Sequence, residues 1–339
     1  MRIGINGFGR IGRLALRTAL QRHAEIEVVA VNDLFDVATA AHLLKHDSTY
    51  GAFPGLVEVD GTALVVDGRR LDFTSQRDWT ELAWGERGIE LVIEATGIGT
   101  RRGDAEKHLV AGAKKVLISA PAKDPDVTLV LGVNGDRYDP EKHHIISNAS
   151  CTTNGLAPVV KVVRDELGLV KGMMTTVHSY TNSQKILDVA APDLREARAG
   201  ALNIVPTSTG AAKAVALVIP EVAGALDGLA YRVPTPTVSI VELVALVERD
   251  TTVDEVNAAL RRAAAGPMKG ILAVTDEPLV SMDLKGNEHS SIVDSLVTGV
   301  VGGNLVKVAA WYDNEWGYAC RIADLAALVA ARAPALATA

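Results

Sequence analysis

Two patterns of apolar and polar residues alternate along residues 1–150. Amphipathic helical segments at 10–22 and 102–112 lie between short, almost uninterrupted apolar runs. Such runs are typical of parallel strands that are covered on both faces. The alternation therefore predicts a doubly wound α/β unit with a parallel sheet. The predicted strands are residues 2–6, 26–32, 89–95, 114–119 and 127–132.

Residues 63–73 predict an attachment to this unit. Two apolar runs flank an Asp-Gly pair, Asp67 and Gly68, which is a strong signal for a tight hairpin.

The pattern changes after residue 150. A helical segment, 155–167, is followed by longer and more widely separated strand-like runs, and a second helical segment, 253–265, lies among them. Such runs suit a mixed or antiparallel sheet, so we expect an α+β domain here. Its predicted strands are residues 172–180, 238–249 and 304–313.

The domain boundaries follow from this change. We expect a first domain of residues 1–150 and a second of residues 151–315. Residues 316–333 form an amphipathic, Ala- and Leu-rich segment, and we expect it to pack back on the first domain as a C-terminal helix.

Composition and charge narrow the class of protein. The 339 residues carry a formal net charge of −7, which argues against nucleic acid or an anionic membrane as the main partner. Two cysteines give no disulfide framework and fit a reducing compartment. The first residues lack the apolar core of a signal peptide, and no apolar run is long enough to span a membrane. The sequence predicts a cytoplasmic protein.

A glycine-rich turn joins the first predicted strand to the first predicted helix. Gly7, Gly9 and Gly12 have the G-x-G-x-x-G spacing that lets a chain turn tightly and place backbone N–H groups against a pyrophosphate. Asp33 ends the next strand, where a carboxylate binds a ribose 2′-OH. Asp33 could instead serve only as a turn or capping residue. The combination predicts a Rossmann dinucleotide site that prefers NAD.

The segment around Cys151 is the strongest candidate for covalent chemistry. Ser150 is a good N-cap, so Cys151 would lie in the first turn of a helix, where the helix dipole stabilises a thiolate. His178, on a strand of the same domain, would lower the thiol pKa further as an imidazolium. The alternatives are a small buried cysteine and a structural histidine.

Two further patterns concern anions and metals. Thr207, Ser208, Thr209 and Gly210 predict a hydroxyl-rich turn before a helix, and Arg232 offers a guanidinium that suits phosphate oxygens. A capped helix and a surface arginine are the alternative. His42 and His46 have a helical spacing that can bind zinc, but no adjacent glutamate or third ligand accompanies them, so no metal site is predicted.

Six segments together resemble phosphorylating glyceraldehyde-3-phosphate dehydrogenase. They follow the order and spacing of that family from residue 2 to about residue 330, and the segment around the cysteine is highly specific. They are INGFGRIGR, SNASCTTN, TTVHSYT, NIVPTSTGAAKAV, RVPTPTVS and WYDNEWGY.

The resemblance implies an activity and an assembly. Cys151 would be the nucleophile and His178 its base, and the enzyme would oxidise a phosphorylated triose with a nicotinamide dinucleotide and inorganic phosphate, reversibly. The family forms homotetramers, with residues 180–205 at a subunit contact.

The resemblance also implies binding roles for residues that match the motifs of the family. Positions that would hold the dinucleotide are Arg10, Ile11, Asp33, Arg77, Ser119 and Asn314. Positions that would bind substrate or phosphate are Ser150, Thr152, Thr181, Arg195, Thr209, Gly210 and Arg232.

The chain departs from the common family pattern at several positions. Gly155 replaces a frequent second cysteine, while Glu196 and Ser183 lie in or near the expected phosphate-binding segment. Val189 and Ala190 replace the Leu-Pro pair of strictly NAD-using relatives, so NADP would be accepted beside a preferred NAD. Erythrose-4-phosphate dehydrogenase and a non-catalytic dinucleotide sensor remain alternative functions.

Overall fold

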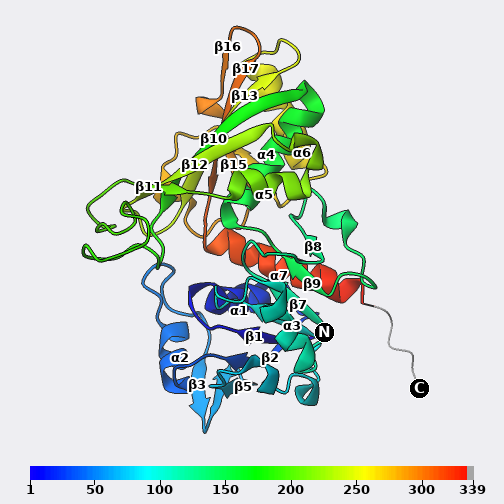
Figure 1. Ribbon diagram of the computed structural model, residues 1–339, viewed down its shortest axis with the longest axis vertical. Helices are drawn as coiled ribbons and strands as arrows, with labels where there is room; N and C mark the ends of the chain where they lie inside the picture. Colours follow the sequence, from blue (N-terminus) through cyan, green and yellow to red (C-terminus); the bar gives the residue numbers. More distant parts are fainter. Residues whose placement is uncertain (334–339) are drawn as a thin grey trace. The chain divides into compact units, whose positions relative to one another are not determined.

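The computed structural model describes residues 1–333, which form two compact units (Figure 1). Unit 1 consists of residues 1–129 and 136–149 together with the segment from Ala319 onward. Unit 2 consists of residues 130–135 and 150–318. No helix in the described part of the chain has the length and apolar character that a membrane crossing requires.

Unit 1 is built on a sheet with the strand order β3-β4-β5-β2-β1-β6-β7-β9-β8. The pairs from β5 to β8 are parallel, and β3, β4 and β5 form an antiparallel edge. The central strands are buried almost throughout, which explains their uninterrupted apolar sequences. The strands are β1 (Arg2–Asn6), β2 (Glu27–Asn32), β3 (Val57–Asp60), β4 (Ala63–Val66), β5 (Arg69–Thr74), β6 (Leu91–Glu94), β7 (Lys115–Ile118), β8 (Val127–Thr128) and β9 (Ile145–Ser147).

The predicted hairpin joins β4 to β5. Asp67 and Gly68 both have positive φ, 49° and 76°, as a tight turn between twisted antiparallel strands requires.

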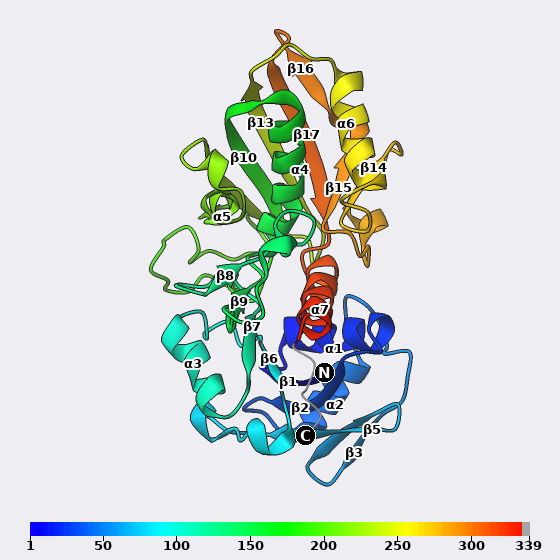
Figure 2. The same cartoon turned by 90° about the vertical axis from the view of Figure 1, so that its right-hand side faces the viewer.

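Helices lie on both faces of this sheet, with α1 on one side and α3 on the other (Figure 2). The last helix, α7, lies beside α1, where Thr18 Oγ1 donates to the carbonyl of Ala319 at 3.2 Å. Asp324 of α7 also accepts from Arg22 and His23 at the end of α1. The helices that contribute to this unit are α1 (Arg10–Arg22), α2 (Val37–Lys45), α3 (Arg102–Val110) and α7 (Trp316–Ala331).

Unit 2 contains a mixed sheet with the order β11-β12-β10-β13-β17-β15-β14, and β16 pairs with β17. The pairs β10–β12 and β14–β15 are parallel, and the other pairs are antiparallel. The two sheets confirm the predicted fold class. The strands are β10 (Leu169–Ser179), β11 (Val205–Ser208), β12 (Leu226–Val233), β13 (Ser239–Val247), β14 (Leu272–Thr275), β15 (Ser291–Asp294), β16 (Gly299–Val301) and β17 (Leu305–Tyr312).

Three helices cover one face of the mixed sheet: α4 (Cys151–Leu167), α5 (Ala211–Val218) and α6 (Val253–Ala265) (Figure 2). Along β13 buried and half-buried residues alternate strictly, as expected when one face of a strand is covered and the other is not. On the other face Met173 and Val177 of β10 are exposed, beside an ion pair between Glu242 and Lys307.

Short 3₁₀ turns connect several of these elements. They are η1 (Trp79–Glu81), η2 (Gly85–Arg87), η3 (Gly135–Arg137), η4 (Pro220–Val222), η5 (Ser281–Leu284) and η6 (Ser295–Val297).

Two local predictions are wrong. The strand expected over 127–132 ends at Thr128, because the chain turns where Val130 N–H donates to the side chain of Asn134. Thr207 and Ser208 belong to strand β11 rather than to a turn, since they pair with Ala230 and Leu229 of β12.

Candidate functional site

The turn between β1 and α1 in unit 1 requires its glycines. Gly7 has φ +93°, and a Cβ there would come within 2.5 Å of Thr96 N. A Cβ on Gly12 would lie 2.0 Å from the carbonyl oxygen of Gly7. A Cβ on Gly9 would meet nothing, so that position faces open space. The turn therefore packs closely against the protein at Gly7 and Gly12 and is open at Gly9, as a phosphate-binding turn must be.

Asp33 holds this turn from the end of β2. Its carboxylate accepts hydrogen bonds from the N–H of Phe8 and from the N–H of Leu34, each at 2.6 Å. Asp33 thus has a turn-stabilising contact, and this contact is compatible with a ribose contact because each carboxylate oxygen has a second lone pair.

A cavity of about 980 Å³ opens beside the turn. Its volume is at the upper end of the range for small-molecule and cofactor sites. A glycine turn, an acidic residue and apolar lining residues such as Leu34 and Ile98 suit a dinucleotide. The lining residues are Asn6, Gly7, Gly9, Asn32, Asp33, Leu34, Gln76, Arg77, Asp78, Trp79, Thr80, Ala95, Thr96, Ile98, Asp104 and Lys107.

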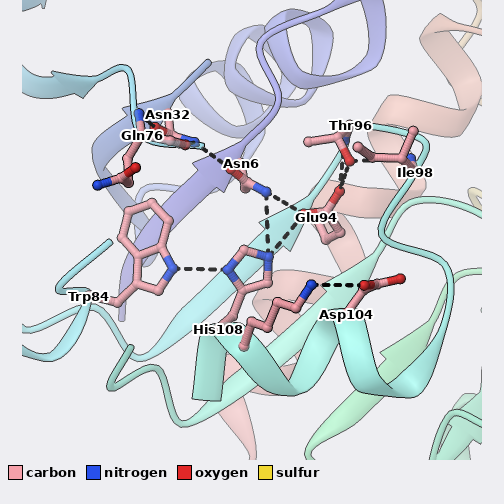
Figure 3. A network of polar contacts seen from close by, with 10 residues as sticks. Asn6, Asn32, Gln76, Trp84, Glu94, Thr96, Ile98, Asp104 and His108 are labelled. Atoms are coloured by element: carbon pink, nitrogen blue, oxygen red, sulfur yellow. Dashed lines mark hydrogen bonds and ion pairs between the residues drawn. The ribbon is translucent and has the colours of Figure 1, made fainter. Parts of the chain in front are cut away.

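A buried polar network lies behind this cavity (Figure 3). The Glu94 carboxylate accepts from Asn6 Nδ2 at 2.6 Å and contacts His108 Nε2 at 3.0 Å. Asn6 in turn accepts from Asn32 Nδ2 at 2.8 Å, and Trp84 Nε1 donates to His108 Nδ1 at 3.1 Å. The network joins the ends of three neighbouring strands, β2, β1 and β6.

The structure gathers only some of the predicted dinucleotide residues at this cavity. Gly7, Gly9, Asp33 and Arg77 line it. Arg10, Ile11 and Gly12 instead form the first turn of α1, where Arg10 pairs with Asp47 at 2.6 Å. Ser119 follows β7 and donates its N–H to the carbonyl of Glu94. Asn314 belongs to unit 2, where its Oδ1 accepts from Ser239 Oγ at 2.9 Å.

The predicted nucleophile and base meet in unit 2. Ser150 caps α4 by accepting from Thr153 N–H at 3.0 Å, which places Cys151 in the first turn of the helix. His178, near the end of β10, lies with Nε2 3.4 Å from Cys151 Sγ. This distance is within reach of a hydrogen bond to sulfur, so the pair can exchange a proton.

A guanidinium contacts the other nitrogen of the same imidazole. Arg232 Nη1 is 2.5 Å from His178 Nδ1 and donates to the carbonyl of Ser179 at 3.2 Å. Nδ1 also lies 2.7 Å from that carbonyl. When Nδ1 accepts from Arg232, the proton of the neutral ring is on Nε2; when Nδ1 donates to Ser179, Nε2 is free to accept the thiol proton.

Burial and the charge of Arg232 shift the pKa values of Cys151 and His178. Burial lowers the pKa of His178 to about 3, and the charge of Arg232 adds to the effect. Burial raises the pKa of the Cys151 thiol, although Arg232 and the hydrogen bonds of Thr152 act in the opposite direction. At neutral pH the resting pair is a thiol and a neutral imidazole. These directions favour a thiol and a neutral imidazole over the imidazolium expected from the sequence.

Tyr312 supports both members of the pair. Its buried hydroxyl lies 2.8 Å from Thr152 Oγ1 and 2.8 Å from Thr176 Oγ1, and its ring meets the His178 ring edge-on at 5.9 Å. Burial raises the pKa of Tyr312. Its phenol is thus a neutral hydrogen-bonding group that fixes the start of α4 against β10.

The residues predicted to bind phosphate are dispersed over unit 2. Thr209 Oγ1 accepts from Ala211 N–H at the start of α5, next to Gly210, the N-cap. Thr181 lies in the exposed loop after β10, where its hydroxyl is 2.9 Å from that of Ser183. Arg195 is exposed in the same loop. Among residues 1–333, no recorded contact joins it to the pair around Cys151.

Several residues of these sites were missed in the sequence. Glu94 and His108 read as a strand end and a helix residue, and only the position of Glu94 at the carboxyl end of a buried strand could have marked it. The sequence indicates Tyr312 only as one residue of the segment WYDNEWGY, with no signal for its own contacts. The rings of His42 and His46 lie 4.9 Å apart and are tilted by 52°, and within residues 1–333 no cluster of three potential ligands forms a metal site.

Comparisons with known proteins match segments of both units to one enzyme family. Residues 1–102 match the family model described as glyceraldehyde 3-phosphate dehydrogenase, NAD binding domain, and residues 150–314 match the C-terminal domain of the same family. The chain is 59% identical over 332 residues to glyceraldehyde-3-phosphate dehydrogenase of Geobacillus stearothermophilus, covering 98% of this chain and 99% of that relative.

Two further relatives carry similar names. Identity is 58% over 330 residues to glyceraldehyde-3-phosphate dehydrogenase 1 of Bacillus subtilis, covering 97% of this chain and 98% of the relative. Identity is 56% over 332 residues to glyceraldehyde-3-phosphate dehydrogenase 2 of Trichormus variabilis, with the same coverage.

Proposed function

The chain belongs to the glyceraldehyde-3-phosphate dehydrogenase family, and on that premise we propose that it oxidises D-glyceraldehyde 3-phosphate with NAD and inorganic phosphate to 1,3-bisphosphoglycerate. The reaction is reversible. One observation carries the proposal: Cys151 Sγ lies in the first turn of α4, 3.4 Å from His178 Nε2.

The first half of the reaction forms a thioester on Cys151. His178 Nε2 accepts the thiol proton, the sulfur bonds to the aldehyde carbon, and the proton passes to the carbonyl oxygen to give a hemithioacetal. His178 takes the hydroxyl proton back as a hydride leaves the same carbon. Bound NAD supplies the acceptor for that hydride.

The second half releases the product. An oxygen of inorganic phosphate bonds to the thioester carbon, the carbon–sulfur bond breaks, and His178 returns its proton to the departing sulfur. Covalent capture on Cys151 thereby divides an oxidation and a phosphorylation into two easier steps.

Arg232 is the residue we expect to bind a substrate phosphate. Its Nε is buried and has no hydrogen-bond partner within residues 1–333, so a donor remains for an anion. Its Nη1 contacts His178 Nδ1. A phosphate that draws Arg232 away would leave Nδ1 to donate to the carbonyl of Ser179, and Nε2 would then be the proton acceptor. Further phosphate or substrate contacts are assigned to Ser150, Thr152, Thr181, Arg195, Thr209 and Gly210.

A steady-state assay tests the proposal. Wild-type enzyme should reduce NAD in the presence of the triose phosphate and phosphate, and turnover should need both. A higher kcat/KM for erythrose 4-phosphate would favour the four-carbon sugar as substrate. Absence of turnover with slow, ordinary alkylation of Cys151 by iodoacetamide would favour a dinucleotide sensor.

We propose that NAD is preferred and NADP is also accepted. The Asp33 carboxylate favours a ribose 2′-OH over a 2′-phosphate. Ala190, beside the exposed Val189, is smaller than the proline of strictly NAD-using relatives. In a tetramer whose 180–205 loop reaches a neighbouring cofactor site, it would leave more room beside that ribose. Replacing Ala190 with proline should lower NADP use and leave NAD turnover intact; an unchanged NADP/NAD ratio would contradict this assignment.

We also propose a homotetramer in the cytoplasm. The uncovered face of the unit 2 sheet, with Met173 and Val177, suits a subunit contact. The loop over residues 180–205 exposes Ile186, Leu187 and Leu194. Light scattering that gives the mass of a single chain at micromolar concentration would refute the assembly.

A further inference from the structure

The Glu94 side chain accepts four hydrogen bonds, and the donors belong to Asn6, Thr96 and His108. Oε2 accepts from Asn6 Nδ2 at 2.6 Å and lies 3.0 Å from His108 Nε2. Oε1 accepts from Thr96 N–H at 2.9 Å and from Thr96 Oγ1. The side chain is 1% exposed, so these bonds replace water completely.

Trp84 fixes the direction of the contact between His108 and Glu94. An indole N–H can only donate, so His108 Nδ1 must accept and carries no proton. The proton of His108 is therefore on Nε2 and points at Glu94. The ring of His108 thus donates to Glu94 from Nε2, and the other donors to Glu94 are Asn6 and Thr96 (Figure 3).

The network shapes the wall of the dinucleotide cavity. Asn6, Thr96 and Ile98 line the cavity, and Ile98 N–H donates to Thr96 Oγ1 at 3.3 Å. A Cβ on Gly99 would lie 2.7 Å from Glu94 Cδ, so the loop after β6 is closed against the carboxylate. Trp79, also in the wall, stacks on His108 at 5.0 Å.

We propose that Glu94 is a positioning residue for dinucleotide binding. Its carboxylate holds the end of β1, the loop after β6 and, through His108, the Trp79 ring in the shape that receives the ligand. Glu94 does not touch the ligand, and it acts through Asn6 and Thr96. The inference deepens the proposed function, because it assumes that the cavity binds NAD.

The direct test is the isosteric variant Glu94→Gln. Its amide has one accepting oxygen, so an N–H group must face either Thr96 or the pair formed by Asn6 and His108. We expect the Kd for NAD, measured by calorimetry, to rise about 10- to 50-fold, because a loosened cavity must be ordered on binding. Turnover at saturating NAD should stay within about threefold of wild type, because ground-state binding alone is lost.

A matched control lies at the other end of the same strand. Glu90, which precedes β6, forms an ion pair with Lys114 at 3.2 Å, and Glu90→Gln should leave the Kd for NAD unchanged. Alkylation of Cys151 by iodoacetamide without NAD should proceed at the wild-type rate in both variants, because Cys151 belongs to unit 2.

A second pair of variants decides the matter if Glu94→Gln does not fold. His108→Gln places an amide N–H near the position of Nε2 and keeps the donor to Glu94, whereas His108→Asn keeps an acceptor for Trp84 and loses that donor. We expect the Asn variant to bind NAD at least about fivefold more weakly than the Gln variant.

The outcomes separate the two proposals. Failure of wild-type protein to bind NAD would overturn the proposed function. Wild-type binding with an unchanged Kd in Glu94→Gln, or with equal Kd values in the two His108 variants, would overturn the role of Glu94 alone.

Discussion

His108 in unit 1 and His178 in unit 2 are both buried histidines in polar surroundings, yet their environments are opposite. His108 has a donor on one nitrogen and an acceptor on the other, so a single neutral form satisfies both contacts. His178 Nδ1 lies between a donor, Arg232, and an acceptor, the carbonyl of Ser179, and both cannot be satisfied at once.

This difference separates a positioning group from a reactive one. A histidine whose two contacts agree has one stable state and serves to hold its neighbours in place. A histidine with conflicting contacts can adopt two tautomers, and a ligand that removes one contact selects between them. For His178 this selection decides whether Nε2 can accept the proton of Cys151.

The largest expected effect concerns the partner of His178. Cys151→Ser should lower kcat for phosphate-dependent NAD reduction by about 10³-fold or more, because a serine hydroxyl next to a neutral imidazole is a poor nucleophile. NAD binding measured by calorimetry should persist. Turnover near the wild-type level would show that Cys151 is not the nucleophile.

Replacing each of the two histidines in turn with asparagine sharpens the comparison. His178→Asn should lower kcat by about 10²- to 10⁴-fold, the usual contribution of a general base, with the Kd for NAD little changed. His108→Asn should show the reverse pattern, a raised Kd and a nearly normal kcat. Equal losses of kcat in both variants would contradict the distinction between a reactive His178 and a positioning His108.

The fixed state of His108 depends on the indole of Trp84. Trp84→Phe should lower the free energy of unfolding by about 1–3 kcal/mol, because His108 Nδ1 is left as a buried acceptor without a donor. Chemical denaturation measures this cost. In a double-mutant cycle with His108→Gln, which lacks the acceptor for Trp84, the two costs should not add; full additivity would mean that the bond contributes nothing.

The smallest effect is the pH dependence that comes from His178. Its pKa is about 3 in the folded protein and about 6.5 in the unfolded chain, so the unfolded state binds more protons between these values. Stability is therefore lost as the pH falls below about 6.5. Between pH 6.5 and 5.5 the wild type should lose about 1 kcal/mol more than His178→Asn, and parallel denaturation curves would contradict the assigned pKa.

Periodicity and short motifs sufficed for the frame of the molecule. The helices at 10–22 and 253–265 have the predicted bounds, and the second begins at a capping box of Thr252 and Glu255 and ends at Gly266. The first strand, 2–6, also has its predicted bounds. Strand β8 was overestimated, since an apolar run cannot reveal that Asn134 captures the N–H of Val130.

The candidate sites likewise combine features that the sequence predicts with contacts that it does not. The segment around Cys151 signals its helix start through Ser150, so the local geometry could be predicted. The contacts of His178 with Arg232 and of Glu94 with His108 join residues far apart in the chain, and they depend on strand register and burial. The pKa of His178 follows from that burial and was inaccessible to motif reasoning.

The arrangement of α7 has a consequence for the order in which the chain folds during synthesis. Ala319 bonds to Thr18 across 301 positions, and Ile322 and Leu325 of this last helix are fully buried. Most of unit 1 thus precedes unit 2 in the chain, but unit 1 lacks part of its core until α7 has been translated. Unit 2, complete at residue 318, needs no later segment. We expect unit 2 to reach its native state first, with the nascent dinucleotide sheet as the species that depends on chaperones.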